Sequence, residues 1–112
     1  MTNKYLLLYR TTSSEPSTPR SPQEMTAMLA QWREWQQAFP SIIDLGNALK
    51  PTGRGIAGKV VTDGPTVESK ELISGYSIVA AADYEAAVVV ARACPILFMP
   101  GARVEVRELA DY

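Results

Sequence analysis

The sequence predicts an α+β fold in which two helices cover one face of a single β-sheet. Short apolar runs that are typical of strands are separated by two longer segments that begin with helix-capping residues. With 112 residues the chain has the length of one domain, so we expect a single domain over residues 1–112 with one hydrophobic core. An apolar fraction of 46% and a charged fraction of 21% favour a folded protein over a disordered one.

The first predicted strand comprises residues 5–9, an apolar run with a tyrosine at each end. Residues 11–22 are rich in Ser, Thr and Pro and are expected to form a surface loop. Ser21 is a good N-cap and Glu24 completes a capping box, so a helix is predicted to begin here. Pro40 is expected to end this helix. Its apolar stripe contains Met25, Met28, Leu29, Trp32, Trp35 and Phe39.

Three further strands are predicted in the middle of the chain. Residues 42–49 suit a strand, with a bulge expected at Gly46. Residues 50–58 contain three glycines and a proline, which indicates a flexible turn. Residues 59–62 are predicted as a short strand that ends at an acidic turn, and residues 75–82 as the next strand.

The second helix is predicted to begin after Asp83, which can cap it, with Glu85 favourably placed in its first turn. Pro95 indicates that this helix ends near the preceding cysteine. Its packing face consists of Ala86, Ala87, Val90 and Ala91. Apolar and charged residues then alternate over residues 103–109, which is typical of a half-buried strand.

The predicted element order is therefore β-α-β-β-β-α-β. Two helices that connect and cover one sheet make a two-layer sandwich, and the natural arrangement is ferredoxin-like with both helices on one face. The second face of the sheet also needs a cover. A second copy of the chain is the simplest cover, so we predict a homodimer.

Composition argues against several classes of function. The formal net charge is -1 and basic residues are scattered among acidic ones, so neither nucleic acid nor a membrane is an expected partner. The chain has no histidine, which removes imidazole-dependent catalysis, and its one cysteine, Cys94, is expected to be a small buried hydrophobe. We find no cofactor, metal or phosphate motif and no signal peptide, so we expect no cofactor and a cytoplasmic location.

The densest polar cluster begins at Asp63, and two interpretations of it are open. In the first, the cluster is a solvated turn, because Asp and a Gly-Pro pair commonly end a strand. In the second, it is a loop at the mouth of a ligand pocket, where Asp63 acts as a base and Lys70 holds an anion. The ligand-binding candidates in this loop are Gly64, Pro65, Lys70 and Glu71.

Four other side chains also have functional interpretations. Trp32 either packs in the core as part of the helical stripe or lines an aromatic pocket. Asp44 lies in an apolar strand and marks a site only if its carboxylate points inward. Glu24 has a sufficient structural role in the capping box, although a carboxylate can also act as a base. Arg10 is a candidate to hold an anionic substrate.

Several ordered motifs resemble those of the YCII-related (YciI-like) family, and specifically those of its branch named for a DGPF motif. They run over nearly the whole chain and comprise KYLLL at residues 4–8, SPQEM at 21–25, GNAL at 46–49, VTDGP at 61–65, GY at 75–76, CP at 94–95 and VEVRE at 104–108. The resemblance implies a ferredoxin-like domain that pairs through its sheets as a dimeric α/β barrel. One departure is Thr66, which stands where the branch motif has phenylalanine.

The resemblance also bears on activity. YciI-like relatives carry a His–Asp dyad, and one such relative is a dehydrochlorinase that acts on a chlorinated aromatic compound. Glu24 aligns near the position of that histidine, so the dyad does not transfer to this histidine-free chain. Some proteins of the DGPF branch look associated with sigma-factor genes, which gives a context for regulation and no mechanism.

Two hypotheses about function follow. The first is a dimeric binding protein or enzyme for a small anionic or aromatic molecule, in which carboxylates carry any proton transfer. The second is a non-catalytic dimeric module that binds a partner or senses a metabolite. For the first, the catalytic candidates are Asp63, Glu24 and Asp44, and the ligand-binding candidates are Arg10, Trp32, Gly64, Pro65, Lys70, Glu71 and Tyr76.

Overall fold

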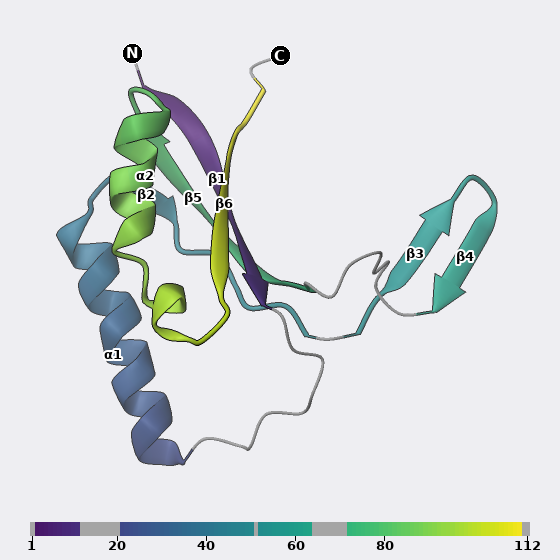
Figure 1. The fold of residues 1–112 in the computed structure, drawn as a ribbon, viewed down its shortest axis with the longest axis horizontal. Helices are drawn as coiled ribbons and strands as arrows, with labels where there is room; N and C mark the ends of the chain where they lie inside the picture. Colours follow the sequence, from purple (N-terminus) through teal and green to yellow (C-terminus); the bar gives the residue numbers. More distant parts are fainter. Residues whose placement is uncertain (1, 12–20, 51, 64–71, 111–112) are drawn as a thin grey trace.

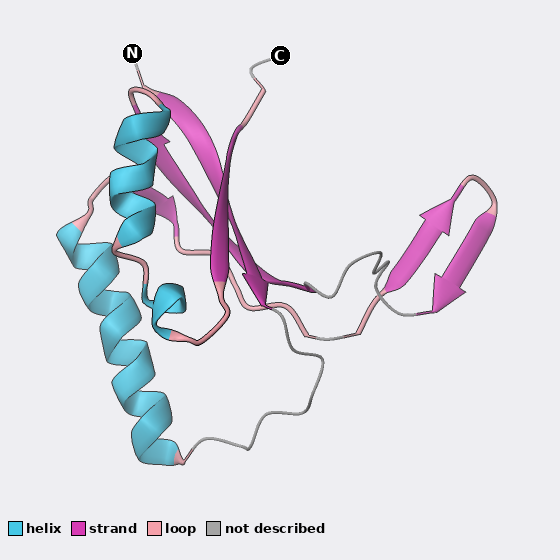
Figure 2. Ribbon diagram, viewed as in Figure 1, coloured by secondary structure: helices cyan, strands magenta, loops and turns pink. Residues whose placement is uncertain are grey.

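A computed structural model describes residues 2–11, 21–50, 52–63 and 72–110 of the chain. In chain order (Figures 1 and 2) the elements are strand β1 (Asn3–Thr11), helix α1 (Pro22–Ala38), strands β2 (Ile42–Asp44), β3 (Arg54–Ala57), β4 (Val60–Asp63) and β5 (Leu72–Ala81), helix α2 (Tyr84–Arg92), the 3-10 helix η1 (Pro95–Phe98) and strand β6 (Arg103–Glu108). The predicted α+β class is confirmed. Within these ranges, no helix combines the length and the apolar character needed to cross a membrane.

Four of the strands form one antiparallel sheet in the order β2-β5-β1-β6. Helix α1 connects β1 to β2 across β5, and helix α2 connects β5 to β6 across β1. This arrangement is consistent with the predicted ferredoxin-like fold. Both helices lie on the same side of the sheet (Figure 1), so none of the described helices covers its other face.

The hydrophobic core lies between the sheet and the two helices. Alternate residues of β1 point toward the helices, so Tyr5, Leu7 and Tyr9 are almost fully buried. Trp35 of α1 ties the helices together, because its Nε1–H donates to the carbonyl oxygen of Val90 in α2 at 2.9 Å. The remaining buried members of the core are Ile42, Val79, Ala81, Ala87, Val90, Ala91 and Cys94. Burial of each large apolar side chain contributes about 1.5–3 kcal/mol.

Both predicted helix starts are confirmed. The hydroxyl oxygen of Ser21 accepts a hydrogen bond from the N–H of Glu24 at 3.1 Å, and Asp83 accepts one from the N–H of Ala86 at 2.9 Å. The carboxylate of Glu24 in turn accepts from the Ser21 hydroxyl at 3.2 Å. Each cap satisfies backbone donors that have no partner within the helix and is worth about 1 kcal/mol.

The predicted stripe of α1 packs only in part. Trp35 is buried and Trp32 and Phe39 pack against the core, but Met25 is 42% and Leu29 is 50% exposed. The N-terminal half of α1 therefore adds little to the core, even though its apolar spacing matches that of the other half.

The middle of the chain differs most from the prediction. Residues 50–58 are predicted as a flexible turn, but β3 forms there and pairs with β4 in a hairpin that is separate from the main sheet. The φ angle of 59° at Gly58 suits the tight turn between these strands. Strand β2 ends at Asp44, and its register shifts between Ile42 and Asp44 instead of at the predicted bulge at Gly46. Strand β5 begins earlier than predicted, and η1 is not predicted.

Candidate functional site

The sheet face that carries no described helix is apolar at its centre. Leu6 and Leu8 of β1 alternate with the core residues of that strand, and they pair with Ile78 and Tyr76 of β5 respectively. All four side chains are partly exposed. A contiguous apolar surface of this kind on a folded protein commonly marks a binding or assembly face. We call Leu6, Leu8, Tyr76 and Ile78 the open face.

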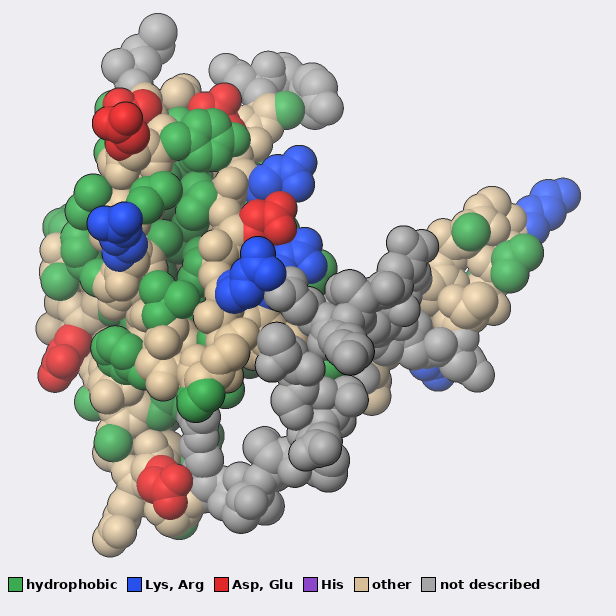
Figure 3. Space-filling model, viewed as in Figure 1, with side chains coloured by type: hydrophobic (Ala, Val, Ile, Leu, Met, Phe, Trp, Pro, Cys, Tyr) green, Lys and Arg blue, Asp and Glu red, His purple; other side chains and the backbone are tan. Residues whose placement is uncertain are grey.

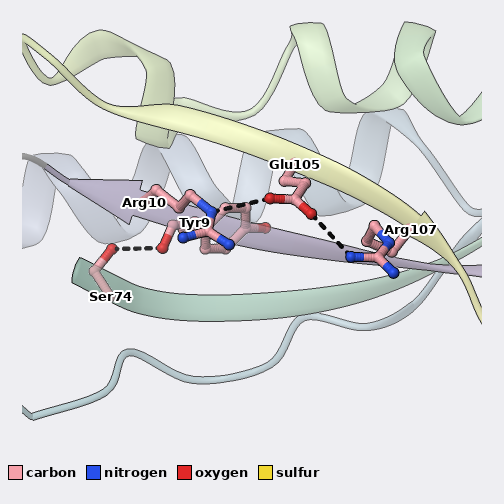
Figure 4. Close-up of polar contacts among 5 residues, drawn as sticks. All are labelled: Tyr9, Arg10, Ser74, Glu105 and Arg107. Carbon is pink, nitrogen blue, oxygen red and sulfur yellow. Dashed lines mark hydrogen bonds and ion pairs between the residues drawn. The ribbon is translucent and has the colours of Figure 1, made fainter. Parts of the chain in front are cut away.

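A row of charged side chains borders the open face along β6. Arg10 Nε lies 3.0 Å from Oε1 of Glu105, and Arg107 Nη1 lies 3.2 Å from Oε2 of the same carboxylate (Figure 4). The register of β6 places Glu105 opposite Leu8 and Arg107 opposite Leu6, so the row lies beside the apolar centre. The hydrogen bond from Arg107, followed by that from Arg10, holds the pKa of Glu105 below its ordinary value.

Regular alternation along β1 places Arg10 in this row, on the same side of the sheet as Leu6 and Leu8, and the register of β1 with β6 continues without a shift as far as Arg10 and Arg103. The register between β1 and β5 shifts between Tyr9 and Arg10, where β5 carries the extra residue Ser74. The hydroxyl of Ser74 in β5 donates to the carbonyl oxygen of Tyr9 at 3.3 Å beside the shift (Figure 4). Arg10 therefore reaches Glu105 from the end of β1, and its side chain is 26% exposed.

The charge balance of the row suits an anion. Two guanidinium groups share one carboxylate, which leaves an excess of one positive charge. Each guanidinium has five N–H donors in a planar fork, and the ion pair with Glu105 engages one nitrogen of each. Forked donors of this kind bind carboxylates and phosphates in two-point geometry. The neighbouring apolar centre offers a surface for the rest of an organic anion.

A second polar group lies under the sheet, on the side of the helices. The Tyr9 hydroxyl donates to the hydroxyl oxygen of Ser77, which donates to the carbonyl oxygen of Leu45 at 2.5 Å. Cys94 is fully buried next to Tyr9, and burial raises the pKa of both the Tyr9 phenol and the Cys94 thiol. A thiol with a raised pKa is a weak nucleophile, so this buried chain of hydrogen bonds has the character of a structural network.

The three predicted catalytic carboxylates belong to three separate elements. Glu24 is exposed in the first turn of α1, where it supports the cap. Asp44 is exposed at the end of β2 and accepts a hydrogen bond from the N–H of Gly46 at 2.8 Å, so it stabilises a local turn. Asp63 ends β4, where its backbone pairs with Arg54 in the hairpin. Among the described residues, no group of three or more Asp, Glu or Cys is placed to hold a metal ion.

The predicted ligand-binding residues lie on both sides of the sheet. Tyr76 belongs to the open face and Arg10 to the charged row beside it. Trp32 lies on the helix side, with its ring 5.6 Å from that of Tyr9 and 5.6 Å from that of Trp35 in T-shaped contacts. A single pocket therefore does not contain Arg10, Tyr76 and Trp32 together. The other candidates, Gly64, Pro65, Lys70 and Glu71, lie outside the described residues.

Two residues of the charged row, Glu105 and Arg107, are absent from the predicted set. Their alternation with valines places them on the solvent side of a half-buried strand, where charged residues are ordinary. The functional signal is their pairing with Arg10, which depends on how β6 aligns with β1. The available signal in the sequence was the alternation of three charged residues, Arg103, Glu105 and Arg107, with valines along one strand.

Comparison with known protein families gives a match. A family model described as the YCII-related domain matches residues 6–110 of the chain, which is nearly its whole length. No curated protein matches the chain.

Proposed function

The chain belongs to the YCII-related family, and on this basis we propose that it is a homodimer that binds a small organic anion beside the open face of its sheet. The observation that carries the proposal is the Arg10–Glu105–Arg107 row next to an apolar surface. The proposed site would lie inside a dimeric α/β barrel, between the two sheet faces.

The dimer is proposed because the open face needs a cover. Its four side chains are Leu6, Leu8, Tyr76 and Ile78, which together would expose apolar surface in a single chain. A second copy would present the same face in a self-complementary way, as two-fold interfaces require. Burial of these side chains in both copies at once would supply much of the association energy.

The ligand class follows from the chemistry of the row. A carboxylate would accept hydrogen bonds from Arg10 and Arg107, while an aromatic or aliphatic body would lie against Leu8 and Tyr76. Arg10 is the better anchor because it is more enclosed than Arg107, whose side chain is 66% exposed. Less solvent around a guanidinium strengthens its bond to an anion.

We propose binding in preference to catalysis. The candidate carboxylates Glu24, Asp44 and Asp63 lie on three separate elements, and the two whose side chains are described have local structural partners. General acid–base catalysis requires such groups within hydrogen-bond reach of one reacting atom. This arrangement favours the non-catalytic alternative, a module that senses a small metabolite.

Thermal unfolding in the presence of benzoate and phenylacetate, with the ionic strength held constant by chloride, tests the ligand proposal. We expect both salts to raise Tm for the wild type and Arg10→Gln to weaken apparent binding by about 10–100-fold, because a hydrogen bond to a charged group is lost. Arg92→Gln is the matched control, since Arg92 is exposed at the end of α2 on the helix side.

Two outcomes would overturn the ligand proposal. One is the absence of any Tm shift for the wild type with either salt, and the other is an equal shift for Arg10→Gln and the wild type. Sedimentation equilibrium tests the dimer separately, and a monomeric mass at micromolar concentration would contradict it.

A further inference from the structure

The β3–β4 hairpin stands apart from the rest of the described chain. The two strands pair with each other through four residue pairs, from Arg54 with Asp63 to Ala57 with Val60, and they form a sheet of their own. Two-stranded hairpins are marginally stable in water without a surface to pack on. A hairpin of this length therefore needs a partner surface to be a stable part of the protein.

The side chains of the hairpin indicate what kind of surface that is. Ile56 is 73%, Val60 is 62% and Val61 is 61% exposed, which places them among the most exposed large apolar residues of the described chain. Ile56 pairs directly with Val61 and shares a face with it, whereas Val60 pairs with Ala57 on the other face. Both faces of the hairpin thus present apolar side chains to solvent, and Figure 3 shows hydrophobic side chains along it.

The direction of the hairpin favours a second copy of this chain as the partner surface. In Figure 1 the two helices lie on one side of the main sheet and the hairpin extends on the opposite side, the side of the open face. A copy that covers the open face must approach from this same side. The hairpin therefore projects into the region that a second copy would occupy, on the same side as the interface that we propose for the sheet.

We propose that the β3–β4 hairpin is a dimerisation arm, which packs its apolar side chains Ile56, Val60 and Val61 against a second copy of this chain. The two-fold axis makes the exchange reciprocal, so each copy holds the arm of the other. The inference rests on the proposed homodimer and adds to it a second contact region outside the open face. The same association would thus cover both sets of exposed apolar side chains.

Substitution of an arm residue tests the inference through the dimer dissociation constant. We expect Ile56→Asp to raise this constant by roughly 30-fold or more, because a carboxylate would be buried in each arm contact. Val89→Asp is the matched control: Val89 is 61% exposed on α2, on the helix side, and its substitution should leave the constant within about 3-fold. Sedimentation equilibrium measures both variants, and far-UV circular dichroism with tryptophan fluorescence checks that each is folded.

Chemical cross-linking gives a second readout on the unaltered protein. Lys59 lies in the turn at the tip of the arm. When 14N-labelled and 15N-labelled chains are refolded together and treated with an amine-specific cross-linker, we expect cross-links from Lys59 that join one light and one heavy peptide. Mass spectrometry distinguishes these links from those within one chain.

The outcomes separate this inference from the proposed function. A wild-type dimer that keeps its dissociation constant in Ile56→Asp, with Lys59 cross-links confined to one chain, overturns the arm and leaves the open-face dimer standing. A monomeric wild type overturns both. Weakened association of Ile56→Asp together with mixed-isotope cross-links supports the arm.

Discussion

One added methyl group at Gly46 should destabilise the fold strongly. Gly46 has a φ angle of 75°, and a Cβ built on it would lie 1.7 Å from the carbonyl oxygen of Tyr76 and 2.7 Å from the carbonyl carbon. Both of these are backbone atoms of the central strand β5. Gly46→Ala therefore combines a backbone conformation that alanine disfavours with a clash that a rotation of a side chain cannot relieve.

The size of the effect follows from the contacts around this position. An ordinary contact begins at 3.4 Å, so the two backbones must separate by a further 1.7 Å. That displacement would break the bonds from Ser77 Oγ to the Leu45 carbonyl at 2.5 Å and from Tyr76 N–H to the Asn47 carbonyl at 3.4 Å. Two lost hydrogen bonds at about 1 kcal/mol each, plus about 1–2 kcal/mol for the left-handed conformation, give about 3–4 kcal/mol.

Urea unfolding followed by the fluorescence of Trp32 and Trp35 measures this loss. Both variants are compared at equal protein concentration, because the apparent stability of the proposed dimer would depend on concentration. We expect the free energy of unfolding to fall by about 3–4 kcal/mol, and Tm in a parallel thermal scan to fall by about 10 °C or more. Gly58→Ala is the matched control. Its φ angle of 59° is also left-handed, but no described atom outside its two chain neighbours lies within 4 Å of the added Cβ. The loss should therefore be limited to about 1–2 kcal/mol for the left-handed conformation, without the lost hydrogen bonds. Equal losses for both variants would refute the close approach at Gly46.

Three further predictions concern individual hydrogen bonds and charges. Ser77→Ala should destabilise the fold by about 2–4 kcal/mol, because the buried Tyr9 hydroxyl and the Leu45 carbonyl both lose their partner. Tyr9→Phe should cost only about 1 kcal/mol, because it removes one of these hydrogen bonds. A larger loss for Tyr9→Phe than for Ser77→Ala in urea unfolding would contradict this network. Ser21→Ala should cost about 1 kcal/mol by removing the α1 cap, and Ser21→Asp should retain most of it in thermal unfolding. The pKa of Glu105 is lower in the folded than in the unfolded state, so its ion pairs stabilise the fold above the unfolded-state pKa and this stabilisation is lost as the pH falls through the folded-state pKa. Glu105→Gln should therefore lose less stability than the wild type below pH 4.5. Equal acid sensitivity of the two proteins would count against the ion pairs.

Local signals were sufficient for the helices and for most strands. Ser21 and Asp83 each carry the oxygen that caps a helix, so a few neighbouring residues determine where α1 and α2 begin. Alternation in β6 likewise predicts which side chains face the core. Strand β4 was predicted, but β3 and its pairing with β4 were missed, because the glycines of residues 50–58 indicate flexibility. One of these glycines, Gly58, makes the tight turn that the two strands require.

The site was harder to predict because its pairing is not local. Arg10 and Glu105 meet only through the alignment of β1 with β6, and each residue taken alone has the features of an ordinary surface charge. Asp44 is the opposite case. A carboxylate in an apolar segment suggested a functional site, but in the structure Asp44 accepts a hydrogen bond from the N–H of Gly46 and stabilises a local turn. Sequence patterns indicate which face a side chain occupies and leave open which charges on that face come together.

The central position of β1 in the sheet has a consequence for how the protein is made. β1 leaves the ribosome first among the described strands, yet its two neighbours are β5 and β6, which emerge much later. Until β5 emerges both edges of an apolar strand are unpaired, and until β6 emerges one edge still is, which is the condition that favours aggregation. Folding that depends on such distant pairings is slow. We therefore expect nascent chains that stop before β6 to need chaperone protection, and the four-stranded sheet to be complete only once residue 108 has left the ribosome.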